Sequence, residues 1–230
     1  SKQTKLFGHD HIFDEIVNLF NKKKLPNKIL LSGPKGIGKS TLCYHFLNYF
    51  FSKNEDYSYD IDNKKINQNN ISFKLIQNHT HPNFYLIDLF DGSKSIEISQ
   101  IRKMIEYSNK SSFNHSSRFI IIDNLEFLNT NSANALLKII EEPNSNLFFI
   151  LINNTNKTIL ETLKSRCINF KMNLSFNESI YITNKLLGVN LFDLMNKDLI
   201  TYYDTPGYLT NLFFFDKKYK IDLKDYDLNE

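Results

Sequence analysis

The chain has 230 residues, of which 41% are hydrophobic and 23% are charged, and its formal net charge is +3. This composition excludes an intrinsically disordered chain, and the near balance of charge gives no sign of a dedicated DNA-binding domain. No apolar run approaches the ~20 residues of a membrane span, and no secretory leader opens the given sequence. Two cysteines are too few for a disulfide framework. We therefore expect a cytoplasmic protein with no membrane partner.

Helical and strand-like patterns alternate along most of the chain. In chain order they predict helix 10–24, strand 28–32, a helix from 39 to 50, strand 84–89, helix 97–109, strand 118–123, helix 132–142, strand 147–152, helix 157–164 and strand 167–171. Residues 53–70 are rich in Asn, Asp and Lys and are predicted to form an exposed loop. Strands that alternate with helices predict an α/β fold of three layers, with a parallel sheet covered on both faces.

The pattern becomes wholly helical near the C-terminal end. Ser175 and Glu178 have the spacing of a capping box, which predicts the start of a helix. Residues 191–203 and 208–215 also have helical spacing, and the polar last fifteen residues are expected to be extended or frayed. We therefore predict two domains, an α/β domain of residues 1–173 and a small all-helical lid domain of residues 174–230.

One glycine-rich segment matches the P-loop pattern G-x-x-x-x-G-K-[ST] in full, and it consists of Gly33, Pro34, Lys35, Gly36, Ile37, Gly38, Lys39 and Ser40. The segment follows a predicted strand and opens a predicted helix, where backbone N–H groups can cradle a polyphosphate. We expect these residues and the following Thr41 to bind ATP or ADP. Lys39 would reach the β- and γ-phosphates, and the Ser40 hydroxyl would hold Mg²⁺.

A second motif, at residues 119–123, is an apolar strand that ends in an acidic residue. Parallel α/β sheets bind ligands at the carboxyl ends of their strands, and Asp123 is predicted to lie there. We expect Asp123 to complete the Mg²⁺ shell beside Ser40. The P-loop domain is therefore predicted to bind nucleotide together with Mg²⁺.

Further motifs surround these two in a fixed order, namely LFGH at 6–9, THPNFY at 80–85, ISQIR at 98–102, NSANALLK at 131–138, EEP at 141–143 and SRC at 165–167. In these motifs the chain resembles the AAA+ clamp-loader subunits, a family shared with replication factor C. Among them it is most similar to the delta-prime family of the bacterial DNA polymerase III clamp loader. The resemblance extends from about residue 6 to residue 215, and the SANALLKIIEEP and SRC motifs together are specific to clamp-loader subunits.

The resemblance implies roles for two more residues. Arg166 falls on the arginine finger, which is inserted into the ATP site of the neighbouring subunit, where its planar fork cannot be copied by a lysine. An arginine at this position fits that role because the chain has 25 Lys but only three Arg. The alternative is that Arg166 caps a helix end or pairs with a carboxylate. Asn154 falls on the sensor 1 position, which contacts the γ-phosphate or its attacking water, although in a chain with 30 Asn this match carries little weight.

The chain also departs from the active members of this family. They place a glutamate that orients the attacking water at the position of Asn124, and a carboxamide cannot accept that proton. Glu126 lies two residues further on, and we expect the turn between them to aim it elsewhere. Residues 204–208, at the start of the lid helix, contain no sensor 2 arginine. Poor hydrolysis of ATP is therefore expected.

Two further departures concern zinc and the collar. Some clamp-loader subunits bind zinc through four cysteines, and residues 52–79 contain none, so we expect no zinc. Three histidines at 79, 81 and 115 lack the spacing of a metal site, and His81 is predicted to pack in a turn. Such subunits also have a helical collar domain through which they assemble, and we expect none within the given residues.

We therefore predict a clamp-loader subunit that binds nucleotide weakly or without efficient hydrolysis and supplies Arg166 to a neighbouring ATP site during loading of the sliding clamp. The expected partners are other clamp-loader subunits in a hetero-oligomeric ring and, through the assembly, the sliding clamp and primer-template DNA. A catalytically active ATPase resembling the gamma/tau subunit is the first alternative. A stand-alone P-loop kinase is the second, although three arginines supply few of the clamps that a kinase needs.

Overall fold

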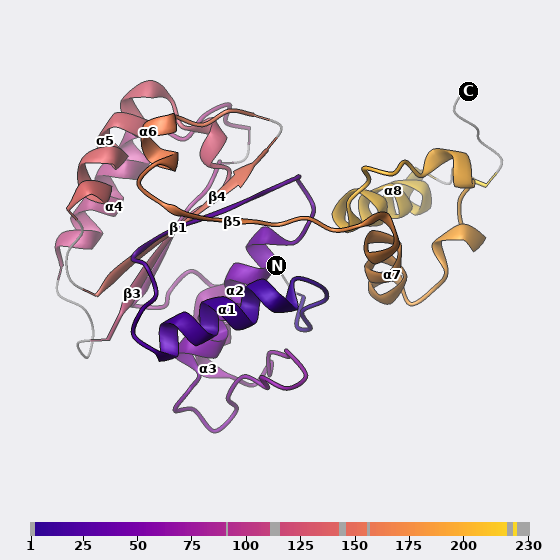
Figure 1. Cartoon of the computed structure of the whole chain (residues 1–230), viewed down its shortest axis with the longest axis horizontal. Coiled ribbons are helices and arrows are strands. Elements are labelled where there is room, and N and C mark those ends of the chain that lie inside the picture. Colours follow the sequence, from indigo (N-terminus) through magenta and orange to yellow (C-terminus); the bar gives the residue numbers. More distant parts are fainter. Residues whose placement is uncertain are drawn as a thin grey trace. The chain divides into compact units, whose positions relative to one another are not determined.

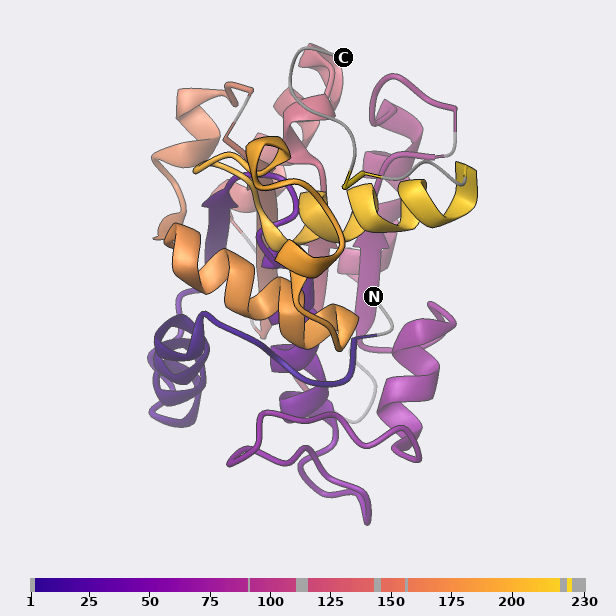
Figure 2. The same ribbon diagram turned by 90° about the vertical axis from the view of Figure 1, so that its right-hand side faces the viewer.

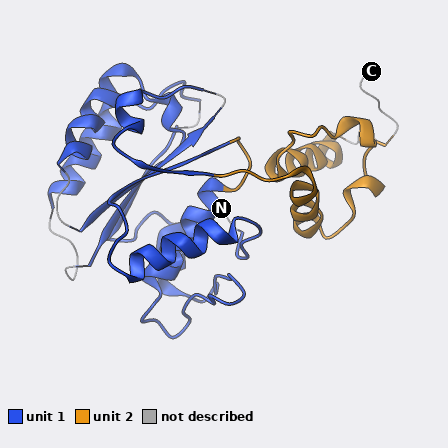
Figure 3. Cartoon of the chain, in the orientation of Figure 1, with its two compact units in different colours: residues 1–33, 39–171 blue, residues 34–38, 172–230 orange. Residues whose placement is uncertain are grey.

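The computed structural model describes residues 3–90, 92–110, 116–142, 146–155, 157–219 and 223–224. Its contacts divide the chain into two compact units (Figure 3). An α/β unit contains residues 1–33 and 39–171, and a helical unit contains residues 172–230 together with residues 34–38. Among the described residues, no helix combines the length and the apolar character needed to cross a membrane.

The α/β unit is built on a five-stranded sheet in the order β2-β3-β4-β1-β5, in which every neighbouring pair is parallel. The strands are β1 (Lys28–Gly33), β2 (Phe84–Ile87), β3 (Arg118–Ile122), β4 (Leu147–Asn154) and β5 (Ile168–Lys171). All five residues of β3 are buried, as expected for a central parallel strand covered on both faces. The predicted parallel α/β fold is confirmed.

Helices cover both faces of this sheet, with α1 (Asp10–Asn21), α2 (Lys39–Phe51) and α3 (Ile71–Gln77) on one side and α4 (Ile98–Asn109), α5 (Thr130–Glu141) and α6 (Glu161–Lys164) on the other (Figure 1). The alternation of side chains along β3 divides the core between the two sides. Ile120 and Ile122 pack with residues of α4 and α5. Phe119 instead faces α2, where its ring centroid lies 5.7 Å from that of Phe46.

The helical unit contains α7 (Phe176–Leu187) and α8 (Pro206–Tyr219), which pack together around a small apolar core (Figure 2). The capping box predicted at Ser175 and Glu178 is present at the start of α7. The prediction of a helix over 191–203 is wrong, because the chain there forms two short 3-10 helices, η3 (Leu191–Asp193) and η4 (Lys197–Leu199). Asparagine side chains accept the backbone N–H groups that begin each of them, and such local bonds compete with a continuous helix.

Other differences from the sequence prediction concern boundaries and one missed helix. Helix α3 follows the predicted loop 53–70 and was not predicted. That loop is only partly exposed, because Tyr59 and Ile66 are buried. Helix α6 is shorter than the predicted span 157–164. The predicted end of a helix at residue 143, His115 and most of the predicted C-terminal tail lie outside the described residues.

Candidate nucleotide-binding site

The candidate site of the α/β unit lies at the carboxyl ends of three neighbouring strands. β1 ends at Gly33, β4 ends at Asn154, and Asp123 directly follows β3. Gly33 and Asn154 are register partners in the sheet, which brings the end of the first strand beside a residue far along the chain. The strand order therefore places the predicted Mg²⁺ ligand and the predicted sensor next to the start of the P-loop.

Lys39, the first residue of α2, is buried, and its ammonium lies among acceptors from two strands. Nζ donates to the Gly33 carbonyl at 2.8 Å and to Oδ1 of Asn154 at 2.9 Å. Burial lowers the pKa of Lys39 to about 8, although the charges of Asp123 and Glu126 oppose the shift. A buried ammonium at the end of parallel strands is suited to receive phosphate oxygens.

Ser40 and Asp123 form the other half of the site. The Ser40 hydroxyl donates to Oδ2 of Asp123 at 2.5 Å, and Oδ1 of Asp123 accepts the backbone N–H of Asn124 at 2.8 Å. Burial raises the pKa of Asp123, and these two hydrogen bonds oppose the shift. A hydroxyl and a carboxylate are hard oxygen ligands of the kind that Mg²⁺ prefers, so the pair fits the predicted Mg²⁺ role of both residues.

The tip of the P-loop, residues 34–38, belongs to the helical unit. There the backbone N–H of Gly207 donates to the Gly36 carbonyl at 2.9 Å, and the Thr205 hydroxyl donates to the Lys35 carbonyl at 2.8 Å. A Cβ at Gly207 would lie 2.7 Å from Cα of Gly36, and Gly36 itself has φ +82°, so both positions need glycine. In the sequence, Gly207 is only part of a stretch without arginine, and no local pattern indicates this contact.

The direction of the Glu126 side chain was predicted wrongly. Its carboxylate accepts the side-chain Nδ2 of Asn154 at 2.6 Å and the backbone N–H of Asn154 at 3.1 Å. Asn124 adopts a left-handed conformation with φ 54°, and the 3-10 helix η2 (Leu125–Phe127) follows at once. This turn directs Glu126 back toward the strand ends rather than away from them, because Leu125 is buried in the core beneath it.

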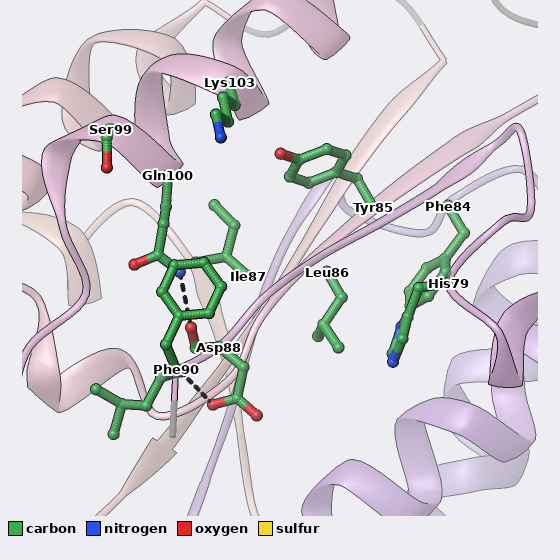
Figure 4. Close-up of a pocket in the computed structure, with 11 residues that line it drawn as sticks. His79, Phe84, Tyr85, Leu86, Ile87, Asp88, Phe90, Ser99, Gln100 and Lys103 are labelled. Carbon is green, nitrogen blue, oxygen red and sulfur yellow. Dashed lines mark hydrogen bonds between the residues drawn. The ribbon is translucent and has the colours of Figure 1, made fainter. Parts of the chain in front are cut away.

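Asp88, just beyond the end of β2, joins the same network and was not predicted as a site residue. Its Oδ1 accepts Nδ2 of Asn124 at 2.7 Å, and its carbonyl accepts Nε2 of Gln100 at 2.8 Å. Asp88 also lines a cavity of about 410 Å³ along the edge strand β2, with Tyr85, Gln100 and Lys103 (Figure 4). The site therefore contains three carboxylates, Asp88, Asp123 and Glu126, linked through two asparagines.

Arg166 makes its hydrogen bonds outside this network. The guanidinium donates to Oε1 of Glu141, at the end of α5, at 2.7 Å and to the carbonyl of Thr162 in α6 at 2.9 Å, and the side chain is 37% exposed. Both contacts of the alternative interpretation, an acidic partner and a helix carbonyl, are thus present. These two contacts within the chain also fix the direction of the half-exposed guanidinium.

The histidines considered for a metal take other roles. The ring of His81 packs on Phe51 with centroids 3.9 Å apart, and its Nδ1 accepts the backbone N–H of Asn83 at 3.2 Å, in agreement with the predicted packing role. Burial lowers the pKa of His81 to about 4. Within the described parts of the chain, no cluster of three or more His, Cys, Asp or Glu residues could hold a metal ion.

The parallel sheet, the complete P-loop and the acidic residue after β3 define a P-loop domain of the AAA+ class. Residues 8–175, more than half of the chain, match the family model described as DNA polymerase III, delta subunit. The chain belongs to this family, and the resemblance to delta-prime subunits of DNA polymerase III is confirmed.

Curated relatives agree with this assignment. The chain is 31% identical over 203 residues to DNA polymerase III subunit gamma of Buchnera aphidicola subsp. Schizaphis graminum, which covers 86% of this chain and 53% of that protein. It is 29% identical over 139 residues to DNA polymerase III subunit delta' of Pseudomonas aeruginosa, covering 60% of this chain and 40% of that protein. The chain thus spans about half of the length of these relatives, or less.

Solved structures agree on the fold. A DNA polymerase III gamma subunit-related protein of Thermotoga maritima matches with a TM-score of 0.53 at 18% identity, over 91% of this chain and 74% of that one. The RuvB Holliday junction branch migration motor of the same organism matches with a TM-score of 0.50 at 15% identity, over 96% of this chain and 68% of that one.

Proposed function

We propose that the chain binds ATP or ADP with Mg²⁺ through residues 33–41 and acts as a subunit of the DNA polymerase III clamp loader. The observation that carries the nucleotide site is the convergence of Lys39 with Ser40 and Asp123 at the carboxyl ends of β1, β3 and β4. Ser40 and Asp123 would hold Mg²⁺, which would supply positive charge that offsets the negative charge of the phosphates. Family membership supports the role in the clamp loader.

Within that role, the chain turns over ATP poorly by itself and supplies Arg166 to the ATP site of a neighbouring subunit. Asn124 cannot accept a proton from water, and its amide is bound to Asp88. The half-exposed guanidinium of Arg166, fixed by Glu141 and Thr162, supports a role toward a partner. The partners would be other clamp-loader subunits and, through them, the sliding clamp and primer-template DNA.

Calorimetric titration tests the nucleotide site. The chain should bind ADP or ATP in the presence of Mg²⁺, and Lys39→Ala should weaken binding by roughly tenfold or more because the phosphate cation is lost. Lys53→Ala is the matched control, because it removes a cation from an exposed position just after α2 and outside residues 33–41. Absence of binding by the unaltered chain would refute the proposal.

An active ATPase of the gamma type remains the second candidate. Two observations favour it, namely the similarity to a gamma subunit and the carboxylate of Glu126 within the site. Phosphate release at saturating ATP separates the two candidates. Turnover near background supports the proposal above, whereas robust turnover that Lys39→Ala abolishes would make the active ATPase the better description.

A further inference from the structure

Glu126 is the group of the site whose position the sequence does not explain. Glu126 is half-buried on η2, and its chain neighbours are the buried Leu125 and the partly buried Phe127. The Phe127 carbonyl accepts the N–H of Ile96 at 2.8 Å. The Lys157 ammonium lies 3.8 Å from the centroid of the Phe127 ring. These contacts hold both neighbours of Glu126, so the direction of its carboxylate is determined by the surrounding structure.

The carboxylate of Glu126 occupies the hydrogen-bond donors of Asn154. It accepts both the backbone N–H and Nδ2 of Asn154, and Nδ2 is also shared with Oδ1 of Asn124 at 3.2 Å. Only Oδ1 of Asn154 is turned toward Lys39, at 2.9 Å. The amide therefore presents an acceptor, rather than a donor, to the place where Lys39 would meet a terminal phosphate.

Glu126 also adds a negative charge beside that place. Its charge acts on the Lys39 ammonium, and Asp88 adds a further carboxylate through Asn124. A nucleoside triphosphate carries more negative charge in total than a diphosphate, and its γ-phosphate must approach the same ammonium. Like charges that lie close together in a partly buried site repel each other strongly enough to change the affinity for a nucleotide.

We propose that Glu126 is a specificity-determining residue that makes this site favour a nucleoside diphosphate over a triphosphate. It does so by occupying the donors of Asn154 and by placing a carboxylate next to the ammonium of Lys39. This inference rests on the proposed function of the P-loop as a nucleotide site. It assigns to Glu126 a role that differs from activation of water.

The test compares the dissociation constants of Mg²⁺-ADP and of Mg²⁺ with a non-hydrolysable ATP analogue, measured by calorimetry on the whole chain. Glu126→Gln keeps the shape, removes the charge and leaves one donor of Asn154 free. It should strengthen binding of the analogue by roughly fivefold or more while ADP binding changes less than about twofold. Glu126→Ala should shift the ratio of the two constants in the same direction.

Glu15→Gln is the matched control, since it removes the same charge from an exposed position on α1 and should leave the ratio unchanged. A general loosening of the site would weaken the binding of both nucleotides in parallel. That outcome, or an unchanged ratio of the two dissociation constants in both Glu126 variants, overturns the inference while the proposed function stands. If the unaltered chain binds neither nucleotide, the proposed nucleotide site is refuted and the inference that rests on it is overturned as well.

Discussion

At the scale of single residues, one buried histidine of the α/β unit is held in one protonation state by its partners. His45 on α2 is fully buried between the Gln3 carbonyl, 3.1 Å from Nε2, and the Tyr59 hydroxyl, 2.9 Å from Nδ1. A carbonyl only accepts, so Nε2 donates to Gln3 and Nδ1 accepts from Tyr59, which is the neutral form of the ring. Burial lowers the pKa of His45 to about 4.

This arrangement predicts how stability depends on pH. Since the pKa of His45 is lower in the folded chain than its ordinary value of 6.5, the contribution of His45 to stability is fully present above pH 6.5 and is lost as the pH falls toward about 4. The loss from this residue should reach roughly 3 kcal/mol. The test is urea unfolding at pH 7.0 and 4.5, which lie at about the two ends of this window. The difference in the free energy of unfolding between these two pH values should be smaller for His45→Gln than for the unaltered chain. His11→Gln, at an exposed position, should behave like the unaltered chain, and equal differences in all three proteins would contradict the assignment.

At the scale of secondary structure elements, one arginine closes the C-terminal end of α4. The guanidinium of Arg118, at the start of β3, donates to the carbonyls of Tyr107, Ser108 and Lys110 at 3.0, 3.0 and 2.6 Å. The last carbonyls of a helix lack partners within the helix and carry a partial negative charge, so a buried cation is well placed there. Arg118 thus joins the helix to the strand that follows it along the chain.

Replacement of this cap should therefore be costly. Arg118→Met should lower the free energy of unfolding by roughly 2–4 kcal/mol because several buried carbonyls lose their donor. Arg118→Lys should recover only part of this, since an ammonium lacks the planar fork that reaches three acceptors. Chemical denaturation measures both values. Arg102→Met, on the exposed face of the same helix, is the control and should change stability by less than about 0.5 kcal/mol; a similar effect of both Met variants would refute the cap.

At the scale of the whole molecule, the proposed role of Arg166 is to complete a site on a partner subunit. Arg166 bonds within the chain only to Glu141 and Thr162 among the described contacts, and its guanidinium remains partly exposed. Arginine fingers of this kind stabilise charge on a transferred phosphoryl group in a neighbouring subunit. A residue that acts in this way is nearly silent in the isolated chain.

Loss of Arg166 should accordingly affect the assembly and not the subunit. Arg166→Ala should leave the chain's own unfolding and nucleotide affinity nearly unchanged, and it should lower the ATPase rate of a clamp loader reconstituted with an active gamma subunit by ~10³-fold at a site that depends on this finger. Lys164→Ala removes a nearby exposed cation and should have no such effect. Full activity of Arg166→Ala in the assembly would disprove the role in trans.

The sequence by itself determined the elements of the fold whose signals are local. Apolar runs predicted all five strands, and the wholly buried β3 shows why an uninterrupted run works as a signal. The P-loop and the capping box at Ser175 were also predictable, because glycine conformation and capping depend on residues within one or two turns. Helical spacing misled the prediction for 191–203, where asparagine side chains bond locally to the backbone.

Only the tertiary structure decided which residues form the polar network beside Lys39. Asp88, Glu126 and Asn154 lie at or after the carboxyl ends of three strands, and they meet because β2, β3 and β4 are neighbours in the sheet with parallel carboxyl ends. The aim of Glu126 depends on the left-handed turn at Asn124 and on the burial of Leu125, and the approach of Gly207 to Gly36 depends on packing over a long span of chain. Such contacts leave no periodic pattern in the sequence, because they are produced by strand order and core packing rather than by the conformational preferences of neighbouring residues.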